Sequence, residues 1–371
     1  MSDVLRIIIS GGGTGGHIFP ALSIADAIRA KRPDAKILFV GAEGRMEMQR
    51  VPQAGYDIKG LPIAGFNRKN LFKNIAVVYK LFKSKRIAKE IIREFQPQVA
   101  VGVGGYASGP TLNVAQDMDI PTLLQEQNSY AGMTNKILGK KADCICVAYE
   151  GMDVFFPADR IVLTGNPIRK NLLDATLSQE EAVRSLGLDP LKKTILIVGG
   201  SLGARTLNES VLSNLSLIAQ QTKVQFVWQT GKYYSTAIAE ELKQRKQPDN
   251  LVVMDFISDM NMAYAAADLV ISRAGAGSIS EFCALGKPVV LVPSPNVAED
   301  HQTKNALALV EKEAALYVKD DEARRTLLPI AINTVQDKRL LYSLSQNIKT
   351  LAHPNAASVI ADEVIRLAEQ G

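Results

Sequence analysis

The sequence has little cysteine, and this excludes two classes of protein. Its 371 residues include three cysteines, too few for the disulfide framework of a small secreted domain. Cys144 and Cys146 stand two positions apart in an apolar run, so on a strand they share a face and are expected in the core. Since no histidine or second cysteine pair lies near them in the sequence, we expect no metal site there.

Long apolar runs are also missing. No run approaches the roughly 20 residues that a membrane-spanning helix needs. The first apolar run, Leu5–Ile9, is too short for a signal peptide, so a cytoplasmic protein is expected. Short-period repeats and low-complexity tracts are absent as well. Hydrophobic residues make up 47% and charged residues 22%, which is typical of globular proteins, and the length suggests two domains.

Positive charge is concentrated in one segment. Arg68 to Arg93 contains nine basic residues and one acidic residue, Glu90, whereas the whole chain carries only +5. The rest of the chain is therefore not basic, and no nucleic-acid partner is expected. A basic amphipathic segment favours a membrane surface, and the alternative is an ordinary helix with a solvated basic face. The membrane-facing candidates are Leu71, Phe72, Lys73, Ile75, Tyr79, Lys80, Phe82 and Lys83, while Ile87, Ile91 and Ile92 are expected to face the core.

Apolar strands alternate with helical patterns along the chain. This alternation predicts an α/β fold with parallel sheets, whose ligands bind at the carboxyl ends of the strands. The predicted strands of the first half are Leu5–Ile9, Lys36–Val40, Val99–Val103, Thr122–Leu124, Cys144–Val147 and Ile161–Leu163. Those of the second half are Thr194–Val198, Gln225–Trp228, Leu251–Met254, Leu269–Ser272 and Val289–Val292. Helices are predicted at Ala21–Ala30, Ile75–Phe95, Thr111–Asp117, Gly132–Gly139 and Ala356–Ala368.

A loop with five glycines follows the first strand and ends at His17. A helix start after such a loop suits an anion, above all a phosphate. His17 is the side chain there that accepts a proton near neutral pH. The spacing Gly11-x-Gly13-x-x-Gly16 also fits a dinucleotide fingerprint, for which Glu43 is the loose acidic candidate. A plain tight turn with His17 as its polar cap is the third interpretation.

A second glycine-rich turn, Gly199–Ala204, follows the first strand of the second half. Two such turns predict two nucleotide-type domains facing a cleft, with the linker near Pro167 to Asp174. In the run Ile271–Glu281, Ser278-x-x-Glu281 fits a capping box, and a carboxylate binding ribose hydroxyls fits equally well. The pair Asp117-x-Asp119 precedes a strand, so we read it as a solvated turn. We expect positive helix ends and Arg169 to carry the charge of a diphosphate without a metal, and we expect no cofactor.

Taken together, these loops closely resemble the MurG family, the UDP-N-acetylglucosamine transferases that act on undecaprenyl-pyrophosphoryl-N-acetylmuramyl-pentapeptide in peptidoglycan synthesis. The resemblance covers nearly the whole chain. Its markers are Gly12–His17, Gly104–Pro110, Glu126–Asn128, Gly165–Arg169, Gly199–Ser201, Phe256-Ile257 and Ser280-Glu281. It implies a glycosyltransferase-B architecture with two Rossmann-like domains. The domains would span residues 1–167, joined by the C-terminal helix 355–371, and residues 168–354.

The resemblance also implies roles for individual residues. The implied donor contacts are Thr14, Gly15, Gly16, Asn128, Arg169, Ser201, Ile257, Ala276, Gly277, Ser278, Ile279, Ser280, Glu281 and Gln302. The Ile257 backbone would read uracil, Glu281 would hold ribose and Gln302 would contact the sugar. Gly104, Tyr106 and Ser108 would lie on the acceptor side, and His17 would be the catalytic base of an inverting transfer. Where the family often has Arg and a second Gln beside Gln302, this chain has His301 and Thr303.

The implied partners are UDP-N-acetylglucosamine, a polyprenyl-linked acceptor, the anionic inner leaflet of the bacterial plasma membrane, and proteins of cell-wall synthesis or cell division. The implied place is the cytoplasmic face of that membrane. Three alternatives are open. The first is a processive or diacylglycerol-directed glycosyltransferase with the same fold. The second and third differ in class, and they are an NAD-dependent oxidoreductase and a non-catalytic membrane-docking partner. Binding titrations with NADH and with UDP would distinguish the oxidoreductase from a glycosyltransferase. Turnover by the purified chain would exclude the non-catalytic role.

Overall fold

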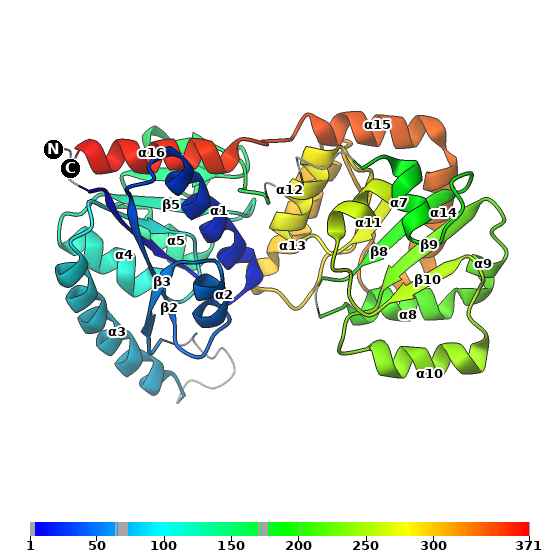
Figure 1. Cartoon of the computed structure of the whole chain (residues 1–371), viewed down its shortest axis with the longest axis horizontal. Coiled ribbons are helices and arrows are strands. Elements are labelled where there is room, and N and C mark those ends of the chain that lie inside the picture. Colours follow the sequence, from blue (N-terminus) through cyan, green and yellow to red (C-terminus); the bar gives the residue numbers. More distant parts are fainter. Residues whose placement is uncertain are drawn as a thin grey trace. The chain divides into compact units, whose positions relative to one another are not determined.

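The chain forms two compact units, each built around its own parallel sheet (Figure 1). The computed structural model describes residues 4–63, 65, 73–169, 172, 177–200 and 202–370, with the backbone alone for 73–76 and 298. Unit 1 comprises Met1–Arg169 together with His353–Gly371, and unit 2 comprises Lys170–Ala352. The chain therefore passes from one unit to the other twice.

Unit 1 contains a seven-stranded sheet in the order β3-β2-β1-β4-β5-β6-β7, and all its pairings are parallel. Its central strands are apolar on both faces, as is usual for a sheet covered by helices on either side. Ile7, Ile8 and Ile9 of β1 are fully buried. The strands are β1 (Arg6–Ser10), β2 (Lys36–Ala42), β3 (Asp57–Leu61), β4 (Val99–Gly102), β5 (Thr122–Glu126), β6 (Cys144–Val147) and β7 (Ile161–Leu163).

Helices cover both faces of this sheet. They are α1 (Gly15–Lys31), α2 (Glu47–Gln53), α3 (Lys73–Phe95), α4 (Ser108–Asp117), α5 (Met133–Leu138) and α16 (Ala356–Gln370), with 3₁₀ turns η1 (Met152–Val154) and η2 (Ala158–Arg160). The last helix, α16, lies beside α1 (Figure 1). Its Ile360, Val364 and Leu367 are buried in the same apolar cluster as β1. Ion pairs Lys31–Asp362 (2.7 Å) and Arg32–Glu369 (3.0 Å) flank this contact.

Unit 2 repeats the plan with a six-stranded parallel sheet in the order β10-β9-β8-β11-β12-β13. Its strands are β8 (Lys193–Val198), β9 (Val224–Gln229), β10 (Leu251–Met254), β11 (Leu269–Ser272), β12 (Val289–Leu291) and β13 (Leu316–Tyr317). Its helices are α7 (Gln179–Ser185), α8 (Arg205–Ser213), α9 (Leu215–Ala219), α10 (Ser235–Arg245), α11 (Met260–Ala266), α12 (Ala276–Leu285), α13 (His301–Val310), α14 (Ala323–Gln336) and α15 (Lys338–Lys349), with 3₁₀ turn η3 (Ala298–Asp300).

Strand order reverses at one point in each sheet. In unit 1 it lies between β1 and β4, and in unit 2 between β8 and β11. At such a point the connections that follow the two neighbouring strands run to opposite faces of the sheet. They leave a crevice at the carboxyl ends of these strands, and ligands bind there. The glycine-rich turns of this chain follow these four strands. The topology thus identifies two candidate ligand sites, one in each unit.

The predicted α/β class with parallel sheets is confirmed, and the differences lie in details. Helix α1 begins at Gly15, six residues before the predicted start, so His17 lies in its first turn. Strands β3 and β13 were not predicted, because one alternates in burial and the other has only two residues. Cys144 and Cys146 are core residues as predicted, and Cys283 is buried too. The contact with Cys144, together with burial, raises the pKa of the Cys146 thiol.

Candidate functional site

The first turn of α1 holds His17 in a defined orientation. Thr14 is the N-cap residue, and the His17 and Ile18 amides donate to its carbonyl. Nδ1 of His17 lies 3.2 Å from the carbonyl oxygen of Gly12 and 3.1 Å from the hydroxyl of Thr14. Because a carbonyl oxygen only accepts, the contact with Gly12 is a hydrogen bond in the tautomer that carries its proton on Nδ1, and in that tautomer Nε2 is the basic nitrogen.

The turn after β4 packs directly against the turn after β1. A Cβ at Gly104 would lie 2.9 Å from Nε2 of His17, and one at Gly105 would lie 2.2 Å from the carbonyl oxygen of Gly12. Both glycines have positive φ, 90° and 87°, which also disfavours any other residue. Tyr106, half exposed, lies over Gly13. These glycines are therefore required by close packing around His17.

A buried carboxylate, which sequence reasoning missed, fills the glycine turn after β1. Glu47, 1% exposed, begins α2 and accepts from the amides of Gly13 (2.9 Å) and Ala42 (3.0 Å). A Cβ at Gly12 would lie 2.2 Å from its Oε1. The sequence predicted a bound anion in this turn, and at the Gly13 amide the carboxylate of Glu47 takes that place. Glu43, the acidic candidate of the dinucleotide interpretation, is exposed and directs its side chain toward Gly60.

A second buried carboxylate organises the loop after β5. Glu126, 2% exposed, accepts from the backbone and side-chain amides of Asn128 at 3.1 and 3.2 Å. It also accepts from the Gly132 amide (3.0 Å) and the Asn135 side chain (2.9 Å). The Asn166 side chain donates to the carbonyl of Gln127 at 2.9 Å and so ties this loop to the connection after β7. Asn128 is therefore held at the carboxyl edge of the sheet.

In unit 2, the turn after β8 is shaped by close backbone contact with the loop after β9. A Cβ at Gly203, whose φ is 81°, would lie 2.1 Å from the carbonyl oxygen of Thr230. The Gln229 side chain donates to the Gly200 carbonyl at 3.0 Å. The turn therefore packs on protein at one side, and α8 begins directly after it at Arg205.

Helix α12 begins at Ala276, and this overturns the predicted capping box. Gly275 is the N-cap residue, so Ser278 lies inside the helix and caps nothing. The carboxylate of Glu281 instead accepts from the hydroxyl of Tyr264 at 3.0 Å. A Cβ at Gly275 or Gly277 would meet nothing within 4 Å, so space is open above this helix start. The implied run Ala276–Glu281 thus forms the first two turns of a helix with an open, positive end.

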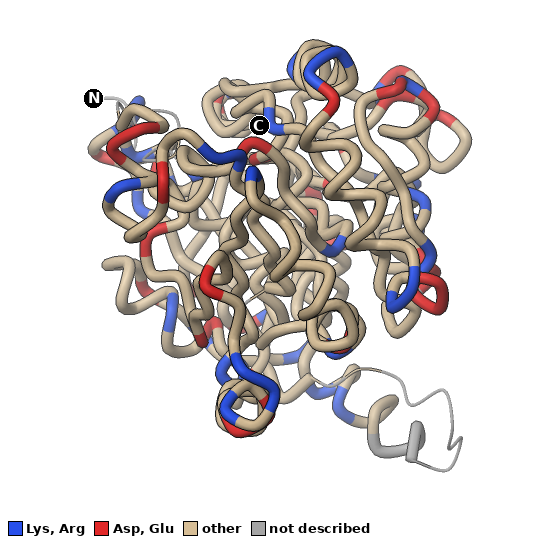
Figure 2. The backbone as a smooth tube through the Cα atoms, turned by 90° about the vertical axis from the view of Figure 1, so that its right-hand side faces the viewer, with Lys and Arg blue, Asp and Glu red and all other residues tan. Residues whose placement is uncertain are grey.

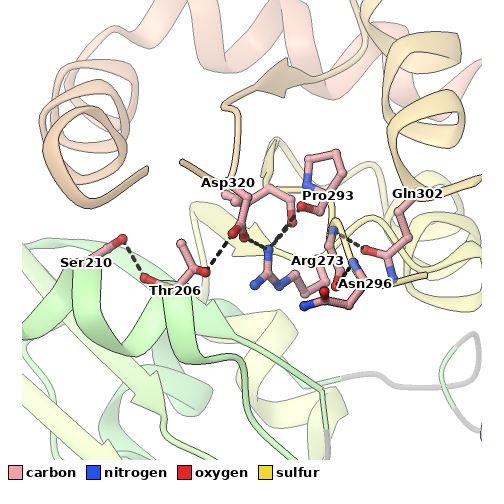
Figure 3. A network of polar contacts seen from close by, with 9 residues as sticks. Thr206, Ser210, Arg273, Pro293, Asn296, Gln302 and Asp320 are labelled. Atoms are coloured by element: carbon pink, nitrogen blue, oxygen red, sulfur yellow. Dashed lines mark hydrogen bonds and ion pairs between the residues drawn. The ribbon is translucent and has the colours of Figure 1, made fainter. Parts of the chain in front are cut away.

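Polar contacts join the connections around this helix start (Figure 3). Arg273, which follows β11, donates to the carbonyls of Val292 (3.0 Å) and Pro293 (3.1 Å) and forms an ion pair with Asp320. Thr206 of α8 donates to the same carboxylate at 2.9 Å. Gln302 of α13 accepts from the Ser294 amide at 2.8 Å through Oε1. Arg273 is a framework residue that sequence reasoning missed, because its partners lie 19 to 47 residues away.

The remaining implied residues have varied surroundings. Ile257 is buried in the connection between β10 and α11. Arg169 is exposed at the end of unit 1. The hydroxyl of Ser108 is fully buried and donates to the carbonyls of Ser10 (2.6 Å) and Gly104 (3.0 Å), which makes it a framework group. Ser201, Leu71 and Phe72 lie outside the described residues, as do the side chains of Lys73 and Ile75.

The basic helix α3 has an exposed apolar surface in its first half. Tyr79 and Phe82 are 70% and 68% exposed, and Lys80 and Lys83 beside them are exposed too. Figure 2 colours the Lys and Arg residues of the chain blue and the Asp and Glu residues red. Further along the helix, Ile91 and Ile92 are buried as predicted, and Ile87 is partly buried against the core. The solvent-facing aromatic rings are not explained by packing within unit 1. No helix among the described residues is long and apolar enough to span a bilayer.

Two other features bear on the location of a ligand. Asp117 ends α4 and lies 3.8 Å from Lys141, at the edge where β5 begins. Within the described ranges, no group of three His, Cys, Asp or Glu side chains is arranged to hold a metal ion. A hollow of about 520 Å³ in unit 2 is lined by Asp189, Gln225 and Asn250, where β8 to β10 begin. This hollow lies at the opposite edge of the sheet from the glycine turns, so the sheet topology does not favour it as the ligand site.

Two doubly wound units, each with glycine turns at its strand reversal, form a glycosyltransferase-B architecture. The chain matches the glycosyltransferase family 28 N-terminal domain over residues 7–147 and the family 28 C-terminal domain over residues 194–360. It belongs to glycosyltransferase family 28.

Curated relatives carry a more specific name. A Bacteroides fragilis protein, 66% identical over 99% of this chain and 97% of its own length, is a UDP-N-acetylglucosamine–N-acetylmuramyl-(pentapeptide) pyrophosphoryl-undecaprenol N-acetylglucosamine transferase. A Porphyromonas gingivalis protein of the same name is 54% identical over 98% of this chain and 96% of its own length. The predicted family resemblance is confirmed.

Solved structures agree with this assignment. Acinetobacter baumannii MurG has a TM-score of 0.78 at 28% identity and covers 98% of this chain and 99% of its own. A UDP-GlcNAc 2-epimerase from Neisseria meningitidis has a TM-score of 0.67 at 14% identity, covering 98% of this chain and all of its own, which shows a shared fold alone. The two-domain architecture predicted from sequence is confirmed.

Proposed function

We propose that this chain transfers N-acetylglucosamine from UDP-N-acetylglucosamine to the 4-hydroxyl of undecaprenyl-pyrophosphoryl-N-acetylmuramyl-pentapeptide, with inversion at the anomeric carbon. The observation that carries the proposal is the 66% identity, over nearly the full length, to a transferase named for this reaction. The paired glycine turns at the strand reversals of both sheets support it.

The donor is held mainly by unit 2. The open first turn of α12 offers backbone amides and a positive dipole end, which suit a diphosphate. Glu281 lies further along this helix, and its carboxylate accepts hydrogen bonds from the ribose hydroxyls. The backbone at Ile257 forms hydrogen bonds with the uracil. The proposed donor contacts are completed by the turn at Gly199–Gly203 and by Thr14, Gly15, Gly16, Asn128, Arg169 and Gln302.

The chemistry is a single displacement. The acceptor 4-hydroxyl oxygen attacks the anomeric carbon, its proton passes to Nε2 of His17, and the bond from that carbon to the UDP oxygen breaks. The hydrogen bond from Nδ1 to the Gly12 carbonyl orients the ring and leaves Nε2 as the acceptor of the proton. Helix-end amides and Arg169 stabilise the charge on departing UDP. The backbone at Gly104, which adjoins the imidazole, and Tyr106, which lies over Gly13, contact the acceptor sugar.

The proposal is tested by incubating the purified chain with UDP-N-acetylglucosamine and a soluble lipid-linked muramyl-pentapeptide acceptor. We expect UDP and the disaccharide product in equal amounts. Turnover with a diacylglycerol acceptor instead, or hydride transfer with NADH, would assign the chain to another activity. Absence of any turnover would favour a non-catalytic role.

Replacing Glu281 by alanine is expected to raise the dissociation constant of UDP about 10- to 100-fold, the usual worth of hydrogen bonds to a charged group. Isothermal titration measures it. Tyr264→Phe is the matched control, because it removes the internal hydrogen bond to the same carboxylate without removing the carboxylate. Equal UDP affinity in the Glu281→Ala variant and the parent would show that this residue serves structure alone.

We expect turnover to be unchanged by a chelator. The positive ends of α1 and α12 and the Arg169 guanidinium supply the charge that many sugar-nucleotide enzymes obtain from a divalent cation. The measurement is initial rate with and without EDTA. Activity lost in EDTA and restored by magnesium or manganese would overturn this expectation.

The same proposal includes a place and a surface for the reaction. An acceptor on a polyprenyl chain stays in the bilayer, so the enzyme must reach it at the inner leaflet of the plasma membrane, on the cytoplasmic face. The exposed Tyr79 and Phe82, flanked by Lys80 and Lys83, suit insertion of aromatic rings among anionic headgroups. The assignment of Leu71, Phe72, Lys73 and Ile75 to the same surface stays a prediction from the sequence. Proteins of cell-wall synthesis or division are further proposed partners.

A further inference from the structure

One peptide unit connects the buried carboxylate of Glu47 to the imidazole of His17. The amide of Gly13 donates to Oε2 of Glu47 at 2.9 Å. The carbonyl of the same peptide, that of Gly12, lies 3.2 Å from Nδ1 of His17. A carboxylate, a peptide and an imidazole are thus joined in series by two hydrogen bonds.

The arrangement around Glu47 is built rather than incidental. Its carboxylate is buried, and Oε1 accepts from the Ala42 amide at the end of β2. Gly12 and Gly41 leave room for it, since a Cβ at either position would lie within 2.6 Å of its atoms. Three chain segments, β1–α1, β2–α2 and β4–α4, therefore meet around one side chain and one peptide.

We propose that Glu47 is a positioning residue for His17, acting through the Gly12–Gly13 peptide. The inference rests on the proposed role of His17 as general base. By accepting from the Gly13 amide, the carboxylate polarises the peptide and strengthens its carbonyl as an acceptor. The stronger acceptor holds the proton on Nδ1, keeps Nε2 as the basic nitrogen, and stabilises the imidazolium formed when Nε2 takes the acceptor's proton.

The other groups near the ring are consistent with this assignment. The Thr14 hydroxyl, which contacts Nδ1, and the Gly104 backbone, which lies next to the ring, are both uncharged. Titratable groups on neighbouring elements of the described part of the chain include Tyr106, over Gly13, and Glu126, which accepts from Asn128, Gly132 and Asn135. Glu47 is the carboxylate whose hydrogen bonds lead to the turn that His17 contacts.

The test is the Glu47→Gln variant, which keeps the shape and removes the charge. We expect kcat to fall about 10- to 100-fold, the cost of misplacing a reacting group, with the KM for the sugar nucleotide unchanged. The imidazole pKa of His17, measured by NMR, should fall, because the imidazolium loses a nearby negative charge. With three histidines in the chain, His17→Asn suffices to assign the signal. Glu43→Gln is the matched control, since it removes an exposed charge four residues away.

Two outcomes overturn the proposal. One is an unchanged His17 pKa and tautomer in a folded Glu47→Gln variant. The other is a neutral His17 protonated on Nε2 in the parent protein, which is measured without any variant and so covers the case in which Glu47→Gln does not fold. Both readouts are independent of turnover. If His17→Ala leaves turnover intact, the proposed base is wrong, whereas the coupling to Glu47 is still decided by the NMR titration.

Discussion

Replacing His17 by alanine is expected to lower turnover by about 10²- to 10⁴-fold, which is the usual contribution of a general base. The expectation follows from the hydrogen bond between Nδ1 and the Gly12 carbonyl, which leaves Nε2 to accept a proton. The measurement is initial rate at saturating donor and acceptor. Because the proposed donor contacts lie mainly in unit 2, UDP affinity should change little.

His17→Asn separates proton transfer from positioning. Asparagine keeps an amide donor near the place of Nδ1 and so can maintain the contact with the Gly12 carbonyl, but it cannot accept a proton at neutral pH. If His17 is the base, the asparagine variant is as slow as the alanine variant. Recovery of turnover in the asparagine variant, or a raised KM with normal kcat in either, would assign His17 to binding.

Reversing Lys73, Lys80 and Lys83 to glutamate is expected to weaken binding to anionic vesicles about 100-fold or more. Each lysine near an anionic surface contributes roughly 1 kcal/mol, and the reversal also adds repulsion. Vesicle sedimentation at low and high salt measures the effect. Activity on a long-chain acceptor in vesicles should fall, while activity on a short-chain soluble acceptor should remain nearly intact.

Lys243, Lys246 and Lys338 provide the matched control. They are exposed residues of unit 2, and reversing them changes the net charge by the same amount. If membrane docking uses α3, this control binds vesicles more strongly than the α3 variant. Equal loss in both variants, equal loss on both acceptors, or vesicle binding insensitive to salt would contradict docking through α3.

The sequence predicted those parts of the fold that depend on local pattern. The strands β1, β4 and β8 are short apolar runs that end in or lead directly into glycine, and β11 is an apolar run followed three residues later by Gly275, so both the strands and the turns could be found. Strand β13 has two residues, and β3 is only partly buried, so neither produces a recognisable run. Their existence depends on pairing with β12 and β2.

Within the candidate site, the sequence pointed to residues whose contacts lie close by in the chain. It did not point to residues whose partners are many positions away. His17 stands at the end of its own glycine loop. Glu47 reaches Gly13 from 34 positions further along, and Arg273 reaches Asp320 across 47. Ser278 and Glu281 show the opposite error. Their spacing matches a capping box, but the helix starts at Ala276, a boundary that residue spacing alone does not fix.

The double passage of the chain between the units has a consequence for biosynthesis. Residues 353–371 complete unit 1, yet the ribosome makes them after all of Lys170–Ala352. At about 5 to 20 residues per second, this delay is roughly 10 to 40 s. Throughout it, the apolar surface that later receives Ile360, Val364 and Leu367 of α16 is uncovered in the nascent chain. Unit 1 therefore finishes folding last although its synthesis begins first, and a fragment ending at Arg169 should need chaperones or bind α16 added as a separate peptide.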